Sequence, residues 1–214
     1  MTHISPSHIL PIVASWHLLH KEFVKHLPEA VGKNAIHLLH SMIFMLHYTC
    51  EYELEYAVQI SIGFYLYDTI YLLKSLSIMY ILHHVITIYL INLAMSAPQH
   101  AASILKGYYI LEVSNIMLYV SYHVRKAHPS KAALIMASEL LQLVWYSYYR
   151  IFKLTPYLYE ISEEAFSTGF GTVAMICAIY AMGLGWSYKL LLKNVNNCAE
   201  IKKMMNEKQT MHES

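Results

Sequence analysis

The stretch MYILHHVITIYLI, residues 79–91, places two adjacent histidines inside an otherwise apolar run. The run belongs to a helix predicted over 78–96, close to the length of about 20 residues that crosses the hydrocarbon core of a bilayer. Ionisable side chains inside a span are costly in lipid and usually face the interior of the bundle, where they have a function. His83 and His84 therefore indicate both a membrane helix and a candidate site.

The composition supports a membrane protein. Hydrophobic residues make up 57% of the 214 residues and charged residues only 14%, whereas a soluble domain carries about a quarter charged residues. The apolar runs are unbroken and do not alternate with polar residues as the strands of a transmembrane barrel do. We therefore predict an all-α, polytopic transmembrane bundle of six or seven spans around a lipid-sized cavity.

Three regions are expected along the chain. Residues 1–33 form an N-terminal segment, 34–192 the transmembrane domain, and 193–214 a polar cytoplasmic tail. The first helix is short and contains Pro11, His17 and His20, so it either spans the membrane or lies in the interface. The seven candidate helices cover residues 8–20, 34–50, 56–73, 78–96, 103–124, 132–152 and 168–192.

The basic residues of the connections predict the orientation. If all seven helices cross, twelve of the 15 Lys and Arg residues fall on one side and only Lys106, Arg150 and Lys153 on the other. Cytoplasmic connections carry the excess of positive charge, which predicts a cytoplasmic C-terminus. If the first helix does not cross, only the N-terminus changes side.

Polar residues recur at helical spacing in several of the predicted spans. Residues three or four apart share a helix face, so these stripes are expected to meet in one cavity that opens toward the cytoplasm. The alternative is that they only hold helices together by hydrogen bonds. The stripes are Ser61, Tyr65 and Asp68; His83, His84 and Thr87; Tyr108, Glu112, Asn115 and Tyr119; and Glu139, Gln142, Tyr146 and Arg150.

A histidine in such a cavity can act as a general base, a nucleophile or a proton shuttle. Adjacent histidines point about 100° apart on a helix, so one is expected to act and the other to bond a neighbouring helix. Asp68 could orient the acting imidazole. We take His83, His84 and Asp68 as candidate catalytic residues. The candidate substrate-binding residues are Tyr65, Thr87, Glu112, Asn115, Glu139 and Arg150.

Several of these segments, in this order and spacing, resemble the TLC-domain family of membrane proteins. The matching pieces are Gly63–Asp68, Leu82–Thr87, Leu111–Asn115, Tyr149–Ile151 and the last span with Gly185, Trp186 and Lys189. The resemblance covers most of residues 34–192. It implies a multi-pass protein of the endoplasmic reticulum membrane that acts in lipid metabolism.

Within this family the chain is similar to the ceramide synthases at the histidine pair and Thr87. There the resemblance implies an acyl-CoA substrate, a histidine that takes the acyl group, and a sphingoid base as acceptor. Where those enzymes carry a His-Asp pair and a second Asp, this sequence has Leu111, Glu112 and Asn115. That version looks more like the TLC-domain proteins of membrane lipid homeostasis.

We therefore expect a protein that binds or processes a membrane lipid or its acyl chain. A ceramide synthase-like N-acyltransferase and a non-enzymatic adaptor or lipid chaperone are the alternatives. The expected partners are a membrane lipid or acyl-CoA, and a homodimer is kept open. A net charge of +1 lacks the basic excess that is typical of nucleic-acid-binding proteins.

We expect no metal and no cofactor. His17/His20 and His37/His40 have HxxH spacing, but the clusters such as HxxHH that membrane di-iron enzymes need do not occur. We expect these histidines to be interface or packing residues. The three cysteines have no CxxC spacing.

Overall fold

A computed structural model of the chain describes residues 6–50, 54–73 and 77–213, and these residues form helices joined by short connections, with no strand among them. The predicted all-α fold is confirmed. The helices are α1 (Pro6–His26), α2 (Glu29–Thr49), α3 (Leu54–Leu73), α4 (Ile78–Ser96), α5 (Pro98–Ala127), α6 (Ala132–Ser147), the π-helix η1 (Tyr148–Lys153), α7 (Leu154–Glu160), α8 (Ser162–Ser167) and α9 (Phe170–Glu213).

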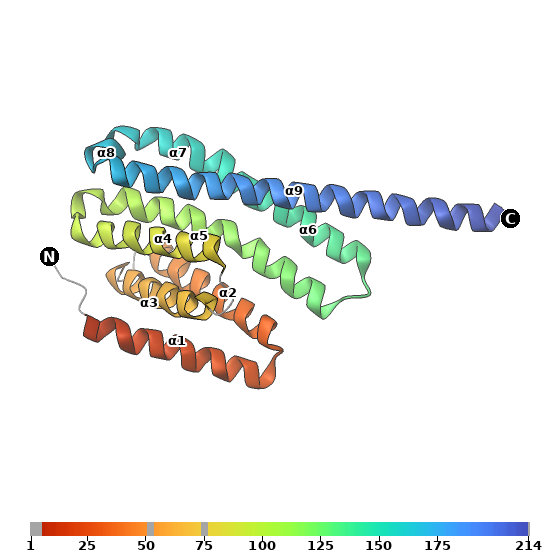
Figure 1. The fold of residues 1–214 in the computed structure, drawn as a ribbon, viewed down its shortest axis with the longest axis horizontal. Coiled ribbons are helices and arrows are strands. Elements are labelled where there is room, and N and C mark those ends of the chain that lie inside the picture. Colours follow the sequence, from red (N-terminus) through yellow and green to blue (C-terminus); the bar gives the residue numbers. More distant parts are fainter. Residues whose placement is uncertain (1–5, 51–53, 74–76, 214) are drawn as a thin grey trace.

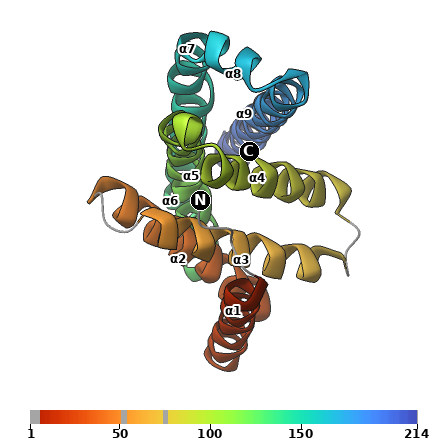
Figure 2. The same ribbon diagram turned by 90° about the vertical axis from the view of Figure 1, so that its left-hand side faces the viewer.

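Helices α1, α5 and α9 and the continuous rod of α6, η1 and α7 run along the length of the molecule (Figure 1), whereas α3 and α4 run across it (Figure 2). Helix α5 is central, because it packs against α2, α4 and α6 (Figure 2). The short α8 connects α7 to α9 at one end. Within the described residues the seven predicted helices are therefore all present. The bounds of α4 are as predicted, and those of the other helices differ somewhat.

Helix α1 packs along α2 and α3 instead of lying across their ends (Figure 1). A Cβ atom at Gly63 of α3 would lie 2.5 Å from Cγ2 of Ile12, so only glycine allows the two helices this approach. Trp16 is buried and its indole N–H donates to the carbonyl of Ile60 at 3.3 Å. These contacts make α1 part of the bundle.

The predicted helix 132–152 contains a change of helix type. Helix α6 ends at Ser147, the π-helical turn η1 follows, and α7 continues to Glu160. Pro156 has no N–H to donate to the carbonyl of Phe152 in the preceding turn. A π turn contains more residues than an α-helical turn, so it changes which side chains face inward. One of them is Arg150, which is buried.

Helix α9 is longer than the predicted 168–192, because it continues to Glu213. The apolar pattern ends near residue 192, but the residues that follow include no glycine or proline and several good helix formers. Loss of hydrophobicity therefore does not end the helix. The predicted polar segment 193–214 is, as far as Glu213, a continuation of α9.

The bundle is apolar outside, and its interior contains polar side chains among hydrophobic clusters. By length and composition alone, two helices of the described chain are apolar enough to cross a membrane, namely α4 and residues 170–199 of α9. The other long helices contain more polar residues, many of them buried, while large apolar side chains cover their outer faces. A large exposed apolar surface around a polar interior is expected of a membrane bundle. Outward-facing examples are Leu46, Ile70, Leu73, Leu140, Leu141, Val144 and Phe152.

Candidate functional site

A cavity of about 560 Å³ lies inside the bundle. Side chains of α2, α3, α4, α5, α6, η1 and α9 line it. The stripes that the sequence predicted to meet on several helices do converge here. Of the predicted site residues, the cavity brings together Tyr65, Asp68, His83, His84, Glu112, Asn115 and Arg150.

Three lysines line the cavity at the end of the bundle where α2 begins and α3 ends. Lys33 is one turn into α2, while Lys189 and Lys193 lie on α9. The Lys33 side chain is 21% exposed, and Lys193 is 35% exposed. The cavity therefore has a basic mouth, where an anionic group of a ligand would be attracted.

Asp68 is the centre of the first polar cluster. Its carboxylate is almost fully buried, and Oδ1 lies 3.2 Å from Nζ of Lys33 and 3.3 Å from Nε2 of His37. Oδ2 lies 3.5 Å from Nε2 of His84. The buried charge is thus compensated by a lysine and two imidazoles, as a buried carboxylate requires.

The other nitrogen of His84 determines how the ring is protonated. The Thr69 hydroxyl donates its hydrogen to the carbonyl of Tyr65 at 2.7 Å, so it accepts a hydrogen bond from the N–H at Nδ1 of His84, at 3.2 Å. A proton on Nε2 would then be shared with Asp68, because the charged imidazole donates from both nitrogens. His84 and Asp68 together can therefore hold and release a proton.

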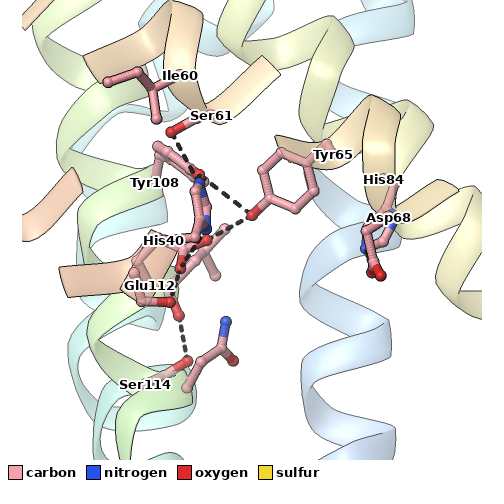
Figure 3. Close-up of polar contacts among 12 residues, drawn as sticks. His40, Ile60, Ser61, Tyr65, Asp68, His84, Tyr108, Glu112 and Ser114 are labelled. Atoms are coloured by element: carbon pink, nitrogen blue, oxygen red, sulfur yellow. Dashed lines mark hydrogen bonds and ion pairs between the residues drawn. The ribbon is translucent and has the colours of Figure 1, made fainter. Parts of the chain in front are cut away.

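Glu112 is the centre of the second polar cluster. Its carboxylate accepts hydrogen bonds from Ser41 and from Tyr65, each at 2.5 Å. The Tyr65 hydroxyl in turn accepts from Tyr108 at 3.3 Å, and His40 lies 3.9 Å from the carboxylate. Figure 3 shows Tyr65 between this cluster and the Asp68–His84 pair. The Glu112 cluster is almost fully buried and internally satisfied.

Arg150 is the centre of a third cluster. Nε donates to the Ser114 hydroxyl at 2.8 Å, and Nη2 donates to the Asn115 side-chain oxygen at 3.3 Å. The guanidinium lies 5.2 Å from the ring centre of Tyr146. A Cβ atom at Gly183 of α9 would lie 3.3 Å from Cδ of Arg150, so the glycine lets the arginine pack against α9.

Two predicted site residues do not line this cavity. Thr87 donates to the carbonyl of His83 at 2.8 Å and lines a separate apolar pocket of about 70 Å³. Its spacing predicted that it shares a helix face with the histidines, but its hydroxyl bonds a carbonyl of its own helix. Glu139 is buried and bonded to Arg125, to Lys193 at 3.0 Å and to Asn197 at 2.5 Å. It anchors α5 and α9 to α6.

Helix α2 provides site residues that the sequence prediction omitted. Lys33, His37 and His40 line the cavity, and Ser41 bonds Glu112. The prediction assigned the histidines to interface or packing. His40 does stack on Phe64, with ring centres 4.0 Å apart, but it also bonds Ser61 at 3.1 Å. The spacing of residues 33, 37, 40 and 41 places them on one helix face, which is the signal that identifies them.

Among the described residues, no group of three or more His, Cys, Asp or Glu is arranged to hold a metal ion. The carboxylates of Asp68 and Glu112 are instead engaged with side chains of the protein. The geometry is that of a site for proton transfer, nucleophilic attack or the binding of a polar lipid group.

An apolar exterior, a bundle of long helices and an internal cavity that contains ionisable side chains define the class of this molecule as a multi-pass membrane protein. A model of the TLC domain matches residues 9–194. The chain therefore belongs to the TLC-domain family, which is integral to membranes and associated with lipid metabolism or homeostasis. The match begins within α1, further toward the N-terminus than the motifs that suggested the family. No curated protein and no solved structure is significantly similar to the chain.

Proposed function

We propose that the protein binds a membrane lipid, or its acyl chain, in the internal cavity and acts on it in lipid homeostasis. The observation that carries the proposal is the cavity itself, about 560 Å³ in volume and lined by both ionisable and apolar side chains. Ligand pockets typically combine an apolar lining with a few convergent polar groups. Phe64, Leu72, Leu118 and Leu190 supply apolar surface beside the three polar clusters.

The histidine pair gives this site a route to chemistry. His84 has both nitrogens engaged, with Thr69 and Asp68, so it suits a role in holding a proton. His83 lines the cavity and its Nδ1 has no hydrogen-bond partner among the described residues. A neutral imidazole is a competent nucleophile. His83 is therefore the better candidate to attack a carbonyl, with His84 and Asp68 beside it to accept the proton.

An acyl-CoA is the substrate that this chemistry favours. The imidazole nitrogen would bond to the thioester carbonyl carbon, the carbon–sulfur bond would break, and CoA would leave as the thiol with the proton that the imidazole gives up. The basic mouth supports this substrate, because Lys33, Lys189 and Lys193 lie where the phosphates of CoA would remain outside the cavity.

Glu112 supports the lipid-homeostasis assignment over the ceramide synthase one. Its two oxygens are occupied by Ser41 and Tyr65, and it makes no contact with either histidine of the pair. Its role in this geometry is to bind α2, α3 and α5 together. Acyl transfer to a sphingoid base is therefore expected to be weak, and a ceramide synthase activity remains the alternative.

We also propose the orientation and the compartment. The lysine-rich end of the bundle would face the cytoplasm, together with the C-terminus, in the endoplasmic reticulum membrane. A tag after residue 214 should then be accessible in selectively permeabilised cells, and a tag inserted at 51–55 should be protected. The reverse pattern would contradict the orientation.

Native mass spectrometry of the purified protein tests the binding proposal. A co-purified lipid or acyl chain is expected, and the same spectrum reports whether the protein is a monomer or a homodimer. A cavity that carries no lipid, and takes none from mixed micelles, would leave the adaptor function as the better explanation.

Incubation with a long-chain acyl-CoA tests the chemistry. A mass increase of one acyl chain is expected on His83, lost in His83→Ala and slowed in Asp68→Asn. Lipidomics of cells expressing the wild type, His83→Ala and His84→Ala at equal levels then assigns the pathway class. A phospholipid change that disappears in a histidine variant supports processing, whereas ceramide rising only with the wild type would establish the ceramide synthase alternative.

A further inference from the structure

Arg150 is a buried positive charge without a counter-ion. Its side chain is 1% exposed, and the ion pairs of the described residues do not include it. Two of its three nitrogens donate to the neutral oxygens of Ser114 and Asn115, and the third, Nη1, has no partner among the described residues. A buried charge normally has an opposite charge beside it.

Two further polar atoms without partners lie in the same wall. The Tyr146 hydroxyl and Nδ1 of His83 are buried and make no hydrogen bond within the described chain. All three residues line the cavity, from α6, η1 and α4. The Arg150 guanidinium carbon lies 5.2 Å from the centre of the Tyr146 ring. The unpartnered atoms of the described chain that lie elsewhere, on His20, Arg125 and Thr172, are not part of the cavity lining.

The buried carboxylates of the described chain, those of Asp68, Glu112 and Glu139, are engaged with other partners. Asp68 is paired with Lys33, His37 and His84, while Glu112 accepts from two hydroxyls. Glu139 does not line the cavity and is paired with Arg125 and Lys193. None of the three carboxylates is therefore left to pair with Arg150.

We propose that Arg150, Tyr146 and His83 form a subsite for the oxyanion of a lipid ligand, either a carboxylate or a phosphate. The proposal rests on the lipid-binding function proposed above, and it adds that the ligand carries a negative charge. Guanidinium N–H groups and a tyrosine hydroxyl are strong donors to such an oxyanion. His83 contributes a third hydrogen bond when Nδ1 carries its proton.

The subsite lies well inside the mouth. Arg150 packs at Gly183 of α9, six residues before Lys189, which corresponds to about 9 Å along the helix. The lysines therefore act on a ligand as it enters, whereas Arg150 binds the anionic group that has entered. A neutral headgroup would leave the guanidinium uncompensated.

Binding of three single-chain ligands with the same chain tests the proposal. Hexadecanoic acid carries a carboxylate, hexadecyl phosphate carries a phosphate, and hexadecanol is the neutral control. In a non-ionic detergent, the purified protein is expected to bind at least one of the two anions about tenfold or more tightly than the alcohol. The anion that binds more tightly identifies the source of the charge.

Arg150→Gln should remove this preference while leaving the affinity for hexadecanol unchanged. Lys153→Gln is the matched control, because it removes one positive charge from the same π turn at an exposed position outside the cavity. It should keep the preference. Tyr146→Phe loses only a hydroxyl and should weaken the binding of the anion severalfold. It provides a second test if the arginine variant does not fold.

The outcomes separate this inference from the proposed function. Equal binding of the anions and the alcohol by the wild type, or an unchanged preference in a folded Arg150→Gln variant, would overturn the subsite alone. Binding of none of the three ligands would overturn the lipid-binding function itself.

Discussion

The buried polar groups on the two sides of the cavity differ in whether the protein provides their hydrogen-bond partners. On the side of α2 and α3, Glu112 is held by Ser41 and Tyr65, and its hydrogen-bonding capacity is met by the protein. On the side of η1 and α4, Arg150, Tyr146 and His83 each retain an unpartnered polar atom. Both sets are buried, so burial does not distinguish them. The satisfied side is expected to stabilise the fold, whereas the unsatisfied side is expected to bind something else.

The largest effect on stability is expected from Glu112→Ala. It leaves the hydroxyls of Ser41 and Tyr65 without an acceptor and opens a cavity, which should lower the free energy of unfolding by about 3 kcal/mol or more. Thermal unfolding in detergent measures it. Glu163→Ala, at an exposed position on α8, is the control and should change little. A Glu112 variant as stable as the wild type would mean that the first side is not structural.

Arg150→Met should behave in the opposite way. It keeps most of the side-chain volume and removes an uncompensated charge, so the ligand-free protein should change by less than about 1 kcal/mol in either direction. The wild type should gain about 3 kcal/mol from an anionic lipid at a hundred times its Kd, and the variant should lose most of this gain. The comparison fails if ligand-free Arg150→Met is as unstable as Glu112→Ala.

A matched pair of Tyr→Phe substitutions sharpens the comparison. Tyr65 and Tyr146 are both buried, but of the two hydroxyls only that of Tyr65 makes hydrogen bonds to the described residues. Tyr65→Phe should cost about 1–3 kcal/mol, because Glu112 loses a donor, whereas Tyr146→Phe should be neutral or slightly stabilising without ligand. Equal costs, measured by denaturant or thermal unfolding, would show that the hydrogen-bond pattern does not decide stability here.

The smallest effect is expected outside the cavity. The hydrogen bond from Ser103 lowers the pKa of Glu164 on α8, and the hydrogen bond from His100 adds to this. Because the pKa of Glu164 is lowered in the folded protein, its carboxylate stabilises the fold at pH values above the ordinary glutamate pKa. This stabilisation is lost as the pH falls through the lowered pKa. Glu164→Gln should cost less than about 1 kcal/mol at neutral pH, and nothing in acid below the lowered pKa. A pH-independent difference in melting temperature would contradict this.

Much of the fold could be predicted because it depends on local patterns. Unbroken apolar runs determine membrane helices, so α4 was predicted with its observed bounds. Helical spacing also placed Tyr65 with Asp68, and Glu112 with Asn115, on shared faces that do reach the cavity. The end of α9 was missed because hydrophobicity reports the membrane part of a helix and not the helix itself.

The sequence by itself determined that this is a helical membrane protein of the TLC-domain family with ionisable groups in its interior. Only the tertiary structure decided which of those groups are satisfied. Glu139 and Arg150 lie on one predicted stripe, yet Glu139 pairs with Arg125 and Lys193 while the π turn directs Arg150 into the cavity. A hydrogen bond between helices depends on the packing of distant segments, and a periodic pattern within one segment contains no information about its partner.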